Sequence, residues 1–476
     1  MFTLNKFYID GAWVDPSATE TMPVMNPASN SQIGVLSLGN GDDVNAAVAA
    51  AKKAFESFSK TSKAERLELL KRLLAVSKAR QEDLAQAITT EMGAPISMSR
   101  ASQADCAVGH LKGFIAALES SEERETLANG DILSREPIGV CGLITPWNWP
   151  INQIALKVIP ALATGSTCVL KPSEHTPLSA QIYAEMVHEA GYPAGVFNLV
   201  FGDGPTVGSA LSRHKDVAMM SFTGSTRAGI LVTKDAADTV KRVTLELGGK
   251  SPNLVFADCD LETRVAESIA ECFHNSGQSC NAPTRMLVES SCYDKVLEIA
   301  AEAGKAQAVG EPTQIGDHIG PLFDQIQYDR VQKLIQVGID EGAKVLVGGL
   351  GKPEGLEDGW YVKPTIFADV TNEMRIAREE IFGPVLVIIP FDTEEEGIRL
   401  ANDTDYGLAA YLQTGSLERA ERVASQLRAG GIHINGQDAG YGSPFGGYKQ
   451  SGNGREGGRF GLEDFQELKV RAPIKL

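Results

Sequence analysis

Cys280 and Glu246 are the residues of this 476-residue chain whose types and settings point most directly to chemistry. Cys280 lies in the run 275–281 (NSGQSCN), and Glu246 opens the run 246–250 (ELGGK), where an apolar strand ends and two glycines follow. A thiolate attacks a carbonyl carbon, and a carboxylate can activate the water that later releases the acyl group. We therefore expect Cys280 to be a covalent nucleophile and Glu246 a general base whose pKa is raised by partial burial.

Cys280 and Glu246 each have a purely structural interpretation as well. A lone cysteine is usually a small buried apolar residue, and a lone glutamate is usually a solvated charge. Cys280, however, follows glycine and glutamine at an expected loop–helix junction, where backbone N–H groups stabilise a thiolate. The presence of both residues favours a catalytic pair, whereas the other six cysteines are expected to be structural. We expect His274 to be structural too, because a spacing of six residues from Cys280 rarely brings two side chains into contact.

The region 138–249 has the pattern of a scaffold that positions such groups. Short apolar strands alternate there with helices, which is typical of a parallel sheet covered on both faces. Strands are expected over 138–144, 166–171, 196–201, 217–222 and 242–247, and helices over 152–163, 177–190, 206–214 and 226–237. The pattern predicts an α/β fold with a doubly wound, Rossmann-like parallel sheet that binds a nucleotide.

The segments on either side continue the α/β pattern. Helices are expected over 44–58 and 62–92, the second with a capping box formed by Ser62 and Glu65. A second α/β region follows from 253 to about 435, with strands at 344–347, 385–391 and 431–434 and helices near 264–273 and 417–427. The polar segment 121–136 predicts a protruding hairpin, and the tail 464–475 predicts a strand.

Composition limits the class of protein. A chain of this length with 43% hydrophobic residues needs more than one core. The net charge of -17 disfavours nucleic acid and anionic lipid as partners. Seven cysteines without C-x-x-C spacing argue against disulfides and a zinc site and favour a reducing, cytoplasmic location. Prolines and a lysine interrupt the longest apolar stretch, 138–163, so no membrane span is expected. No signal-peptide pattern opens the chain. The cysteine spacing gives no reason to expect a metal.

Further polar and glycine-rich runs follow the expected strands, and each by itself is compatible with an ordinary turn. They are 145–150 (TPWNWP), 171–177 (KPSEHTP), 202–208 (GDGPTVG), 222–229 (FTGSTRAG), 379–385 (EEIFGPV) and 444–452 (PFGGYKQSG). The runs 202–208 and 222–229 both lack the G-x-G-x-x-G spacing. A helix N-terminus with Gly and Ser nevertheless binds pyrophosphate, and the amide of Asn148 is a neutral donor suited to an oxyanion.

Taken in order, these motifs resemble the aldehyde dehydrogenase superfamily over nearly the whole chain. The resemblance implies the roles already expected for Cys280 and Glu246. It implies that Asn148 and the Cys280 backbone N–H form an oxyanion hole. It also implies that Lys157 and Glu456 are proton-relay residues, although an ordinary ion pair is an equally good interpretation of both.

The resemblance further implies an NAD site. A carboxylate at Glu174 accepts both hydroxyls of the adenine ribose and repels a 2′-phosphate, so NAD is expected rather than NADP. Lys171 would reach the same ribose, Glu380 the nicotinamide ribose, and Phe382 the nicotinamide ring. The implied cofactor residues are Thr145, Trp147, Lys171, Glu174, Gly204, Gly224, Ser225, Leu247, Glu380 and Phe382.

The implied architecture has three parts: an NAD-binding domain (1–120 and 138–248), a catalytic α/β domain (249–455) and a small β oligomerisation element (121–137 and 456–476). A homodimer or homotetramer is therefore expected. Hydrolysis is favoured over transfer of the acyl group to coenzyme A, because acylating relatives generally lack the Glu246 base.

The implied substrate pocket contains no cation, which disfavours a dicarboxylic semialdehyde; its residues are Trp149, Leu156, Ser279, Asn281, Ala439 and Phe445. Two rival functions remain at this point. A cysteine hydrolase or thioesterase would turn over an ester without nicotinamide. A non-catalytic scaffold protein would need neither Cys280 nor Glu246.

Overall fold

Five parallel strands form the centre of an eight-stranded sheet in the first half of the chain. The structure, a computed structural model, describes residues 1–473. In spatial order the five strands are β10 (Phe197–Leu199), β9 (Thr167–Lys171), β8 (Val140–Ile144), β11 (Met219–Thr223) and β12 (Arg242–Glu246). The strand order reverses at β8, and a doubly wound sheet binds ligands beyond the carboxyl ends of its strands at such a point. The predicted Rossmann-like sheet is confirmed.

Antiparallel strands complete this sheet at both edges. They are β2 (Phe7–Ile9) and β3 (Ala12–Val14) beyond β10, and β20 (Gly452–Asn453) beyond β12. A separate small sheet contains β1 (Phe2–Leu4), β5 (Ser31–Ser37) and β4 (Thr21–Asn26). Because β20 comes from the last quarter of the chain, the C-terminal region lies against the end of β12, where Glu246 is located.

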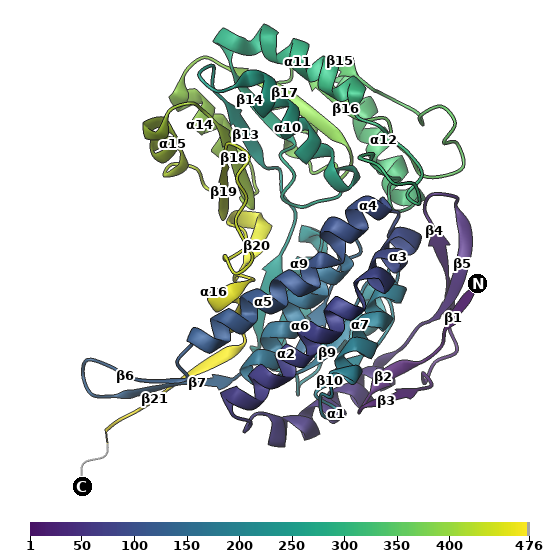
Figure 1. The fold of residues 1–476 in the computed structure, drawn as a ribbon, viewed down its shortest axis with the longest axis vertical. Helices are drawn as coiled ribbons and strands as arrows, with labels where there is room; N and C mark the ends of the chain where they lie inside the picture. Colours follow the sequence, from purple (N-terminus) through teal and green to yellow (C-terminus); the bar gives the residue numbers. More distant parts are fainter. Residues whose placement is uncertain (474–476) are drawn as a thin grey trace.

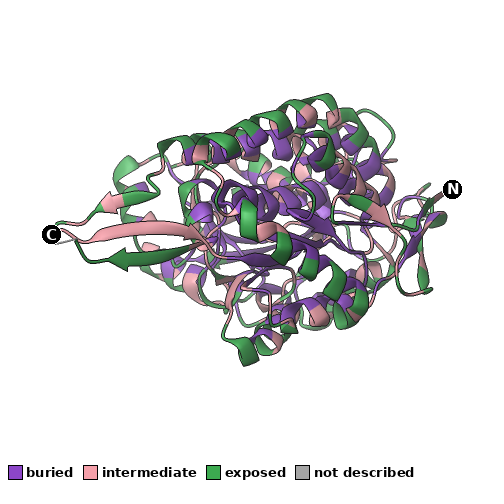
Figure 2. Cartoon of the chain, turned by 90° about the horizontal axis from the view of Figure 1, so that it is seen from below, coloured by how far each residue is buried: buried purple, intermediate pink, exposed green. Residues whose placement is uncertain are grey.

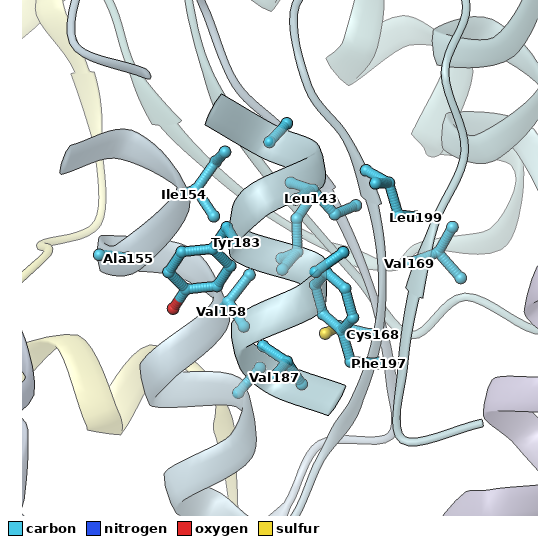
Figure 3. Close-up of a cluster of buried hydrophobic side chains, with 14 of the residues drawn as sticks. Leu143, Ile154, Ala155, Val158, Cys168, Val169, Tyr183, Val187, Phe197 and Leu199 are labelled. Atoms are coloured by element: carbon cyan, nitrogen blue, oxygen red, sulfur yellow. The ribbon is translucent and has the colours of Figure 1, made fainter. Parts of the chain in front are cut away.

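Two groups of helices cover the two faces of the sheet. On one face lie α1 (Gly41–Phe58), α8 (Ser209–Arg213) and α9 (Thr226–Ala236). On the other lie α6 (Pro150–Thr164) and α7 (Pro177–Glu189), with α2 (Lys63–Ala79), α3 (Gln81–Met92) and α5 (Asp105–Ser120) packed around them. Figure 3 shows α6 and α7 placing residues four positions apart, such as Ile154 with Val158 and Tyr183 with Val187, against the strands. This spacing matches the helical period. Because helices cover both faces of the sheet, its strands are apolar throughout.

The predicted helix over 62–92 is two helices. The capping box of Ser62 and Glu65 is confirmed at the start of α2, but Arg80 (φ -102°, ψ 10°) leaves the helical conformation and separates α2 from α3. The sequence interpretation assigned no helix between 96 and 120, where the chain forms α4 (Ile96–Met98), a π-helix η1 (Ser99–Gln103) and α5. Two glycines weaken the helical signal of α5; a Cβ atom at Gly113 would lie 3.1 Å from the backbone of Gly442, so a loop passes close to the helix there.

A seven-stranded sheet forms the second lobe, drawn in green in the upper part of Figure 1. Its spatial order is β15 (Lys344–Val347), β16 (Thr365–Ala368), β17 (Val385–Phe391), β14 (Arg285–Glu289), β13 (Pro252–Val255), β18 (Ala409–Gln413) and β19 (Gly431–Ile434). Only β15 is antiparallel to its neighbour. All three strands predicted in this region are present, so the second α/β unit is confirmed.

The helices of the second lobe pack on both faces of its sheet and create two hydrophobic clusters. They are α10 (Leu261–Phe273), α11 (Tyr293–Ala306), α12 (Gln325–Asp340), α13 (Arg375–Arg378), α14 (Glu394–Asn402) and α15 (Leu417–Ala424). Near the end of the chain, α16 (Gly458–Asp464) packs against α5 and α6 of the first lobe.

A three-stranded arm projects from the body of the molecule (Figures 1 and 2). It contains β6 (Arg124–Thr126), β7 (Ile132–Pro137) and β21 (Gln466–Arg471). The predicted hairpin over 121–136 is confirmed, and so is a strand within the tail, although residues 474 and 475 of that prediction lie outside the described residues. The domain bounds themselves stay predictions. No helix within residues 1–473 has the combination of length and apolarity needed to cross a membrane.

Candidate active site

Cys280 lies on a tight loop that leads into the second sheet. The loop follows α10 as a 3-10 turn, η4 (His274–Gly277), and β14 begins shortly after Cys280. The predicted loop–helix junction is therefore wrong, because the element after Cys280 is a strand. Asn275 (φ 53°) and Ser276 (φ 57°) are both left-handed, a conformation that costs energy for residues other than glycine. A Cβ atom on Gly277 (φ 70°) would clash with the carbonyl of Gly383, so this position requires glycine.

The Cys280 thiol is held in its protonated form. Burial raises its pKa, and the nearby carboxylates of Glu380 and Glu246 raise it further. The backbone N–H of Cys280 lowers the pKa, as the sequence interpretation expected of such donors, but this effect is the smaller one. The residue as a whole keeps partial exposure to solvent, although its thiol is buried. The sulfur must therefore lose its proton as part of any attack on a substrate.

Glu246 ends β12 as a buried and uncompensated carboxylate. It is 3% exposed, and neither carboxylate oxygen has a hydrogen-bond partner among residues 1–473. Burial raises its pKa well above the usual value, and Glu456 raises it further, while Lys157 and Arg455 oppose the shift. A Cβ atom at Gly446 (φ 153°) would lie 2.6 Å from Oε1, so a glycine is needed there for close approach. The predicted direction of the pKa shift is confirmed.

Lys157 and Glu456 form an ion pair beside Glu246. Lys157 is fully buried on α6, and its Nζ donates to Glu456 and, at 2.6 Å, to Oγ1 of Thr223. The second carboxylate oxygen of Glu456 is buried and has no partner among residues 1–473. Lys157 and Glu456 are thus an ion pair. Their charges also act on the candidate base, because Glu456 raises the pKa of Glu246 and Lys157 lowers it.

Asn148 joins the first lobe to the loop that carries Cys280. The side chain is 4% exposed, and Nδ2 donates to the carbonyl of Gln278 at 2.9 Å. One residue further on, Nε1 of Trp149 donates to Oγ of Ser279 at 2.8 Å. An amide nitrogen carries two protons, so Asn148 keeps a second donor after bonding Gln278. Cys280, Glu246 and Asn148 therefore come together from three segments that are far apart in sequence.

Several of the predicted cofactor residues lie at the carboxyl ends of the parallel strands. Thr145 follows β8, and its Oγ1 is buried without a hydrogen-bond partner in the part of the chain that the structure describes. Lys171 ends β9 and donates from Nζ to Glu174 at 3.0 Å. Burial acts to raise the pKa of Glu174, but the charge of Lys171 and hydrogen bonds outweigh it and lower the pKa. Glu174 is therefore an anion, as an acceptor of ribose hydroxyls must be.

Gly204, Gly224 and Ser225 lie where helical segments begin after strands of the same sheet. Gly204 begins a π-helix, η2 (Gly204–Gly208), and a Cβ atom placed on it meets no atom within 4 Å. Gly224 follows β11, and Ser225 caps α9 by accepting from the N–H of Ala228 at 3.3 Å. The remaining donors of a helix N-terminus are suited to a phosphate.

Glu380, Phe382, Trp147 and Leu247 lie where the two lobes meet. Oε1 of Glu380 accepts from the backbone N–H of Gly249 at 3.0 Å, and burial raises the pKa of this carboxyl. Trp147 stands edge-on to Phe382, with ring centroids 5.6 Å apart, and Leu247 donates its N–H to the carbonyl of Ser451 at 2.9 Å. With the free hydroxyl of Thr145 and the capped N-terminus of α9, these groups fit a dinucleotide.

Five residues that contact the predicted site were missed by the sequence interpretation. Phe323 stacks on Trp147 with centroids 4.3 Å apart, and Tyr411 bonds through its hydroxyl to the carbonyl of Asn281 at 3.1 Å. The others are Gln103, Asn275 and Arg455, of which the first two bond to Asn148 and the third affects the pKa of Glu246. Asn275 lies within the quoted run around Cys280, but no local pattern marks the other four, because each acts through a partner that is distant in sequence.

Comparison with known proteins agrees with this geometry. The model of the aldehyde dehydrogenase family matches residues 13–471. A 3-succinoylsemialdehyde-pyridine dehydrogenase from a Pseudomonas species is 52% identical, over 98% of both chains. A Bartonella henselae aldehyde dehydrogenase structure superposes with a TM-score of 0.97 at 50% identity, covering 99% of each chain. A Pseudomonas syringae aldehyde dehydrogenase C mutant, in complex with NAD+ and octanal, has a TM-score of 0.97 at 48% identity, covering 99% of this chain and 98% of that chain. This chain belongs to the aldehyde dehydrogenase family.

Proposed function

We propose that the protein oxidises an aldehyde to its carboxylic acid, with NAD as the hydride acceptor, through a thioester on Cys280. One observation carries the proposal: a cysteine, an uncompensated buried glutamate and an asparagine amide meet at the carboxyl end of a doubly wound sheet. A cysteine hydrolase would need the first two groups but not the dinucleotide-fitting groups that surround them. The relatives named above, one of them in complex with NAD+, support the oxidative function.

In the first stage Cys280 becomes acylated. Its thiol loses a proton to water and attacks the aldehyde carbon, and the resulting oxyanion accepts from the free amide proton of Asn148 and from the Cys280 N–H. The dinucleotide, when bound, accepts the hydride that leaves the substrate carbon. Cys280 is left carrying a thioester.

In the second stage Glu246 acts on the thioester. Its carboxylate takes a proton from a water molecule, and the water attacks the acyl carbon and releases the acid. The raised pKa of Glu246 makes it a stronger base than a solvated carboxylate, and the charges of Lys157 and Glu456 beside it influence how readily it takes and releases the proton. Tight packing at Gly446 keeps the carboxylate in place.

The cofactor is NAD rather than NADP, held by the residues described at the strand ends. Support comes from Glu174, whose lowered pKa makes it a negative charge beside Lys171. A second negative charge on a 2′-phosphate would be repelled at that position.

The preferred aldehyde carries no carboxylate at its far end. Tyr411 bonds to Asn281, the residue after Cys280, and the carboxyl groups of Glu271 and Asp438 lie close enough to raise the pKa of Tyr411. Burial raises the pKa of Glu271, and the nearby charge of Asp438 raises it further. An anionic group bound beside Tyr411 would be repelled by these carboxyl groups. The octanal in one relative's complex and the pyridine in another relative's name agree with an uncharged or basic substrate.

The protein works in the cytoplasm as a homodimer or homotetramer. All seven cysteines are free, as expected in a reducing compartment. The arm formed by β6, β7 and β21 exposes Leu468 (65%) and Val470 (59%), apolar side chains that a partner subunit would cover. In this proposal 1–120 and 138–248 bind NAD, 249–455 supply the nucleophile, and 121–137 with 456–476 join the subunits.

The test is an assay of the purified protein with octanal and either NAD or NADP, following nicotinamide absorbance. Reduction of NAD by octanal supports the proposal. Hydrolysis of an ester without any reduction of NAD by a panel of aldehydes would replace it with the hydrolase function.

A further inference from the structure

Gln103 is a fully buried amide that contacts the candidate oxyanion donor from a separate part of the chain. It is 0% exposed and ends the π-helix η1. Its Nε2 donates to the backbone carbonyl of Asn148 at 3.0 Å and, less closely, to Oδ1 of Asn275 at 3.5 Å. The mechanism described above assigns nothing to Gln103.

These contacts hold Asn148 at both ends. The backbone carbonyl of Asn148 accepts from Gln103 and, at 3.0 Å, from Nδ2 of Asn275, while the side-chain Nδ2 is bonded to the carbonyl of Gln278. With the backbone and one amide proton fixed, the direction of the second amide proton is fixed too. An oxyanion donor is effective only if it is oriented before charge develops, so this restraint has a catalytic consequence.

The local backbone supports a functional role for these contacts. Asn275 is left-handed, and its Nδ2 also donates to the Gln278 carbonyl at 3.3 Å, so its side chain links the Cys280 loop to Asn148. The bond from Gln103 to Oδ1 sets the orientation of that amide. Gln103 is the last residue of the π-helix η1, and single π turns of this kind are frequent at functional sites.

We propose that Gln103 is a positioning residue for oxyanion stabilisation, acting through Asn148. The inference rests on the proposed function, because the orientation of Asn148 matters only if its amide stabilises the adduct on Cys280. Gln103 itself does not touch the reacting atoms; it limits the motion of the residue that does.

The test is a double-mutant cycle with Gln103→Met and Asn148→Ala. Methionine keeps the length of the side chain and removes both the donor and an Oε1 that is buried without a partner among the described residues. Single-turnover oxidation of octanal, with enzyme and NAD in excess, is measured for each variant. We expect Gln103→Met to slow the reaction about tenfold in the wild-type background and less than about twofold in the Asn148→Ala background. An equal slowing in both backgrounds, or none in the wild-type background, would overturn the proposal.

Gln413 provides a matched control. It is also a buried glutamine whose Nε2 donates to an asparagine oxygen, Oδ1 of Asn253 at 3.0 Å, and whose Oε1 has no partner within residues 1–473, but it lies on β18 in the second sheet. Gln413→Met should leave the single-turnover rate unchanged, and thermal unfolding of both methionine variants separates lost folding from lost chemistry.

A second variant keeps the test decisive if Gln103→Met does not fold. Gln103→Leu is close in volume and has no hydrogen-bond donor, so we expect the same loss of rate, and a retained rate would refute the inference. Failure of the proposed function has a different signature, since the wild-type protein itself would then reduce no NAD.

Discussion

Replacement of Glu246 by glutamine isolates the step in which the thioester is hydrolysed. Glutamine has nearly the same shape, so the packing against Gly446 is preserved, and the Lys157–Glu456 ion pair does not depend on the substituted side chain. The substitution removes the only group that we assign to proton abstraction from water. We therefore expect acid release to become rate-limiting while acylation of Cys280 continues.

The magnitude follows from the isolation of the carboxylate. Because Glu246 has no hydrogen-bond partner among residues 1–473, no neighbouring side chain already shares its proton and can replace it directly. A positioned general base contributes about 10²- to 10⁴-fold. This range corresponds to about 3–5 kcal/mol of activation free energy, so kcat should fall by that factor.

The assay is rapid mixing with octanal and NAD. Glu246→Gln should give a burst of reduced nicotinamide close to one per active site, followed by a very slow steady state. Glu267→Gln, an exposed substitution on α10, should behave as the wild type does. Absence of the burst would show that the glutamate acts before hydride transfer, and an undiminished steady state would refute its role as the base.

The raised pKa of Glu246 also predicts a pH dependence. The base is competent only when ionised, so wild-type kcat should rise as the pH passes through the raised pKa. The folded pKa exceeds the unfolded value of about 4.3, so the stability that the protonated group contributes at low pH is lost as the pH rises. Glu246→Gln should therefore raise Tm relative to the wild type at alkaline pH and not at about pH 4. An equal change in Tm at both pH values would contradict the burial of an ionised carboxylate.

The remaining predictions concern the nucleophile, the cofactor and the substrate. Cys280→Ala should abolish reduction of NAD by octanal, whereas Cys259→Ala should not; measurable turnover by the first variant would remove the covalent mechanism. Glu174→Ser should raise the NADP-to-NAD ratio of kcat/KM about tenfold, because it removes a charge that repels the 2′-phosphate; an unchanged ratio would mean that this side chain does not face the ribose. Glu271→Gln should raise kcat/KM for an aldehyde bearing a carboxylate, relative to octanal, by roughly threefold to tenfold; identical ratios would place the carboxylate of Glu271 away from the substrate.

Regular structure was predictable wherever a local signal exists. The five strands and the helices between them were identified because apolar runs and helical spacing are short-range properties. The capping box at Ser62 is equally local, since its two residues are three positions apart. The break at Arg80 and the helix α5 were missed, because both involve contacts with distant elements: Arg80 pairs with Glu185 and Glu189 of α7, and the loop at Gly442 packs close to α5.

The site shows the same division. The residue types and their settings identified Cys280 and Glu246 as candidates, and the resemblance to a known family assigned Asn148 its role. The sequence pattern also led to the wrong expectation that Cys280 precedes a helix, because a run of small and polar residues does not distinguish a junction with a helix from one with a strand.

The amino-acid sequence by itself determined the elements, their alternation and the chemical groups available to them. Only the tertiary structure decided that the Cys280 thiol is protonated, that Glu246 is left without a partner, and that Gln103 bonds to Asn148. The physical reason is range. Backbone conformation responds to neighbouring residues, whereas a pKa or a buried hydrogen bond depends on burial and on groups that the fold brings from remote parts of the chain.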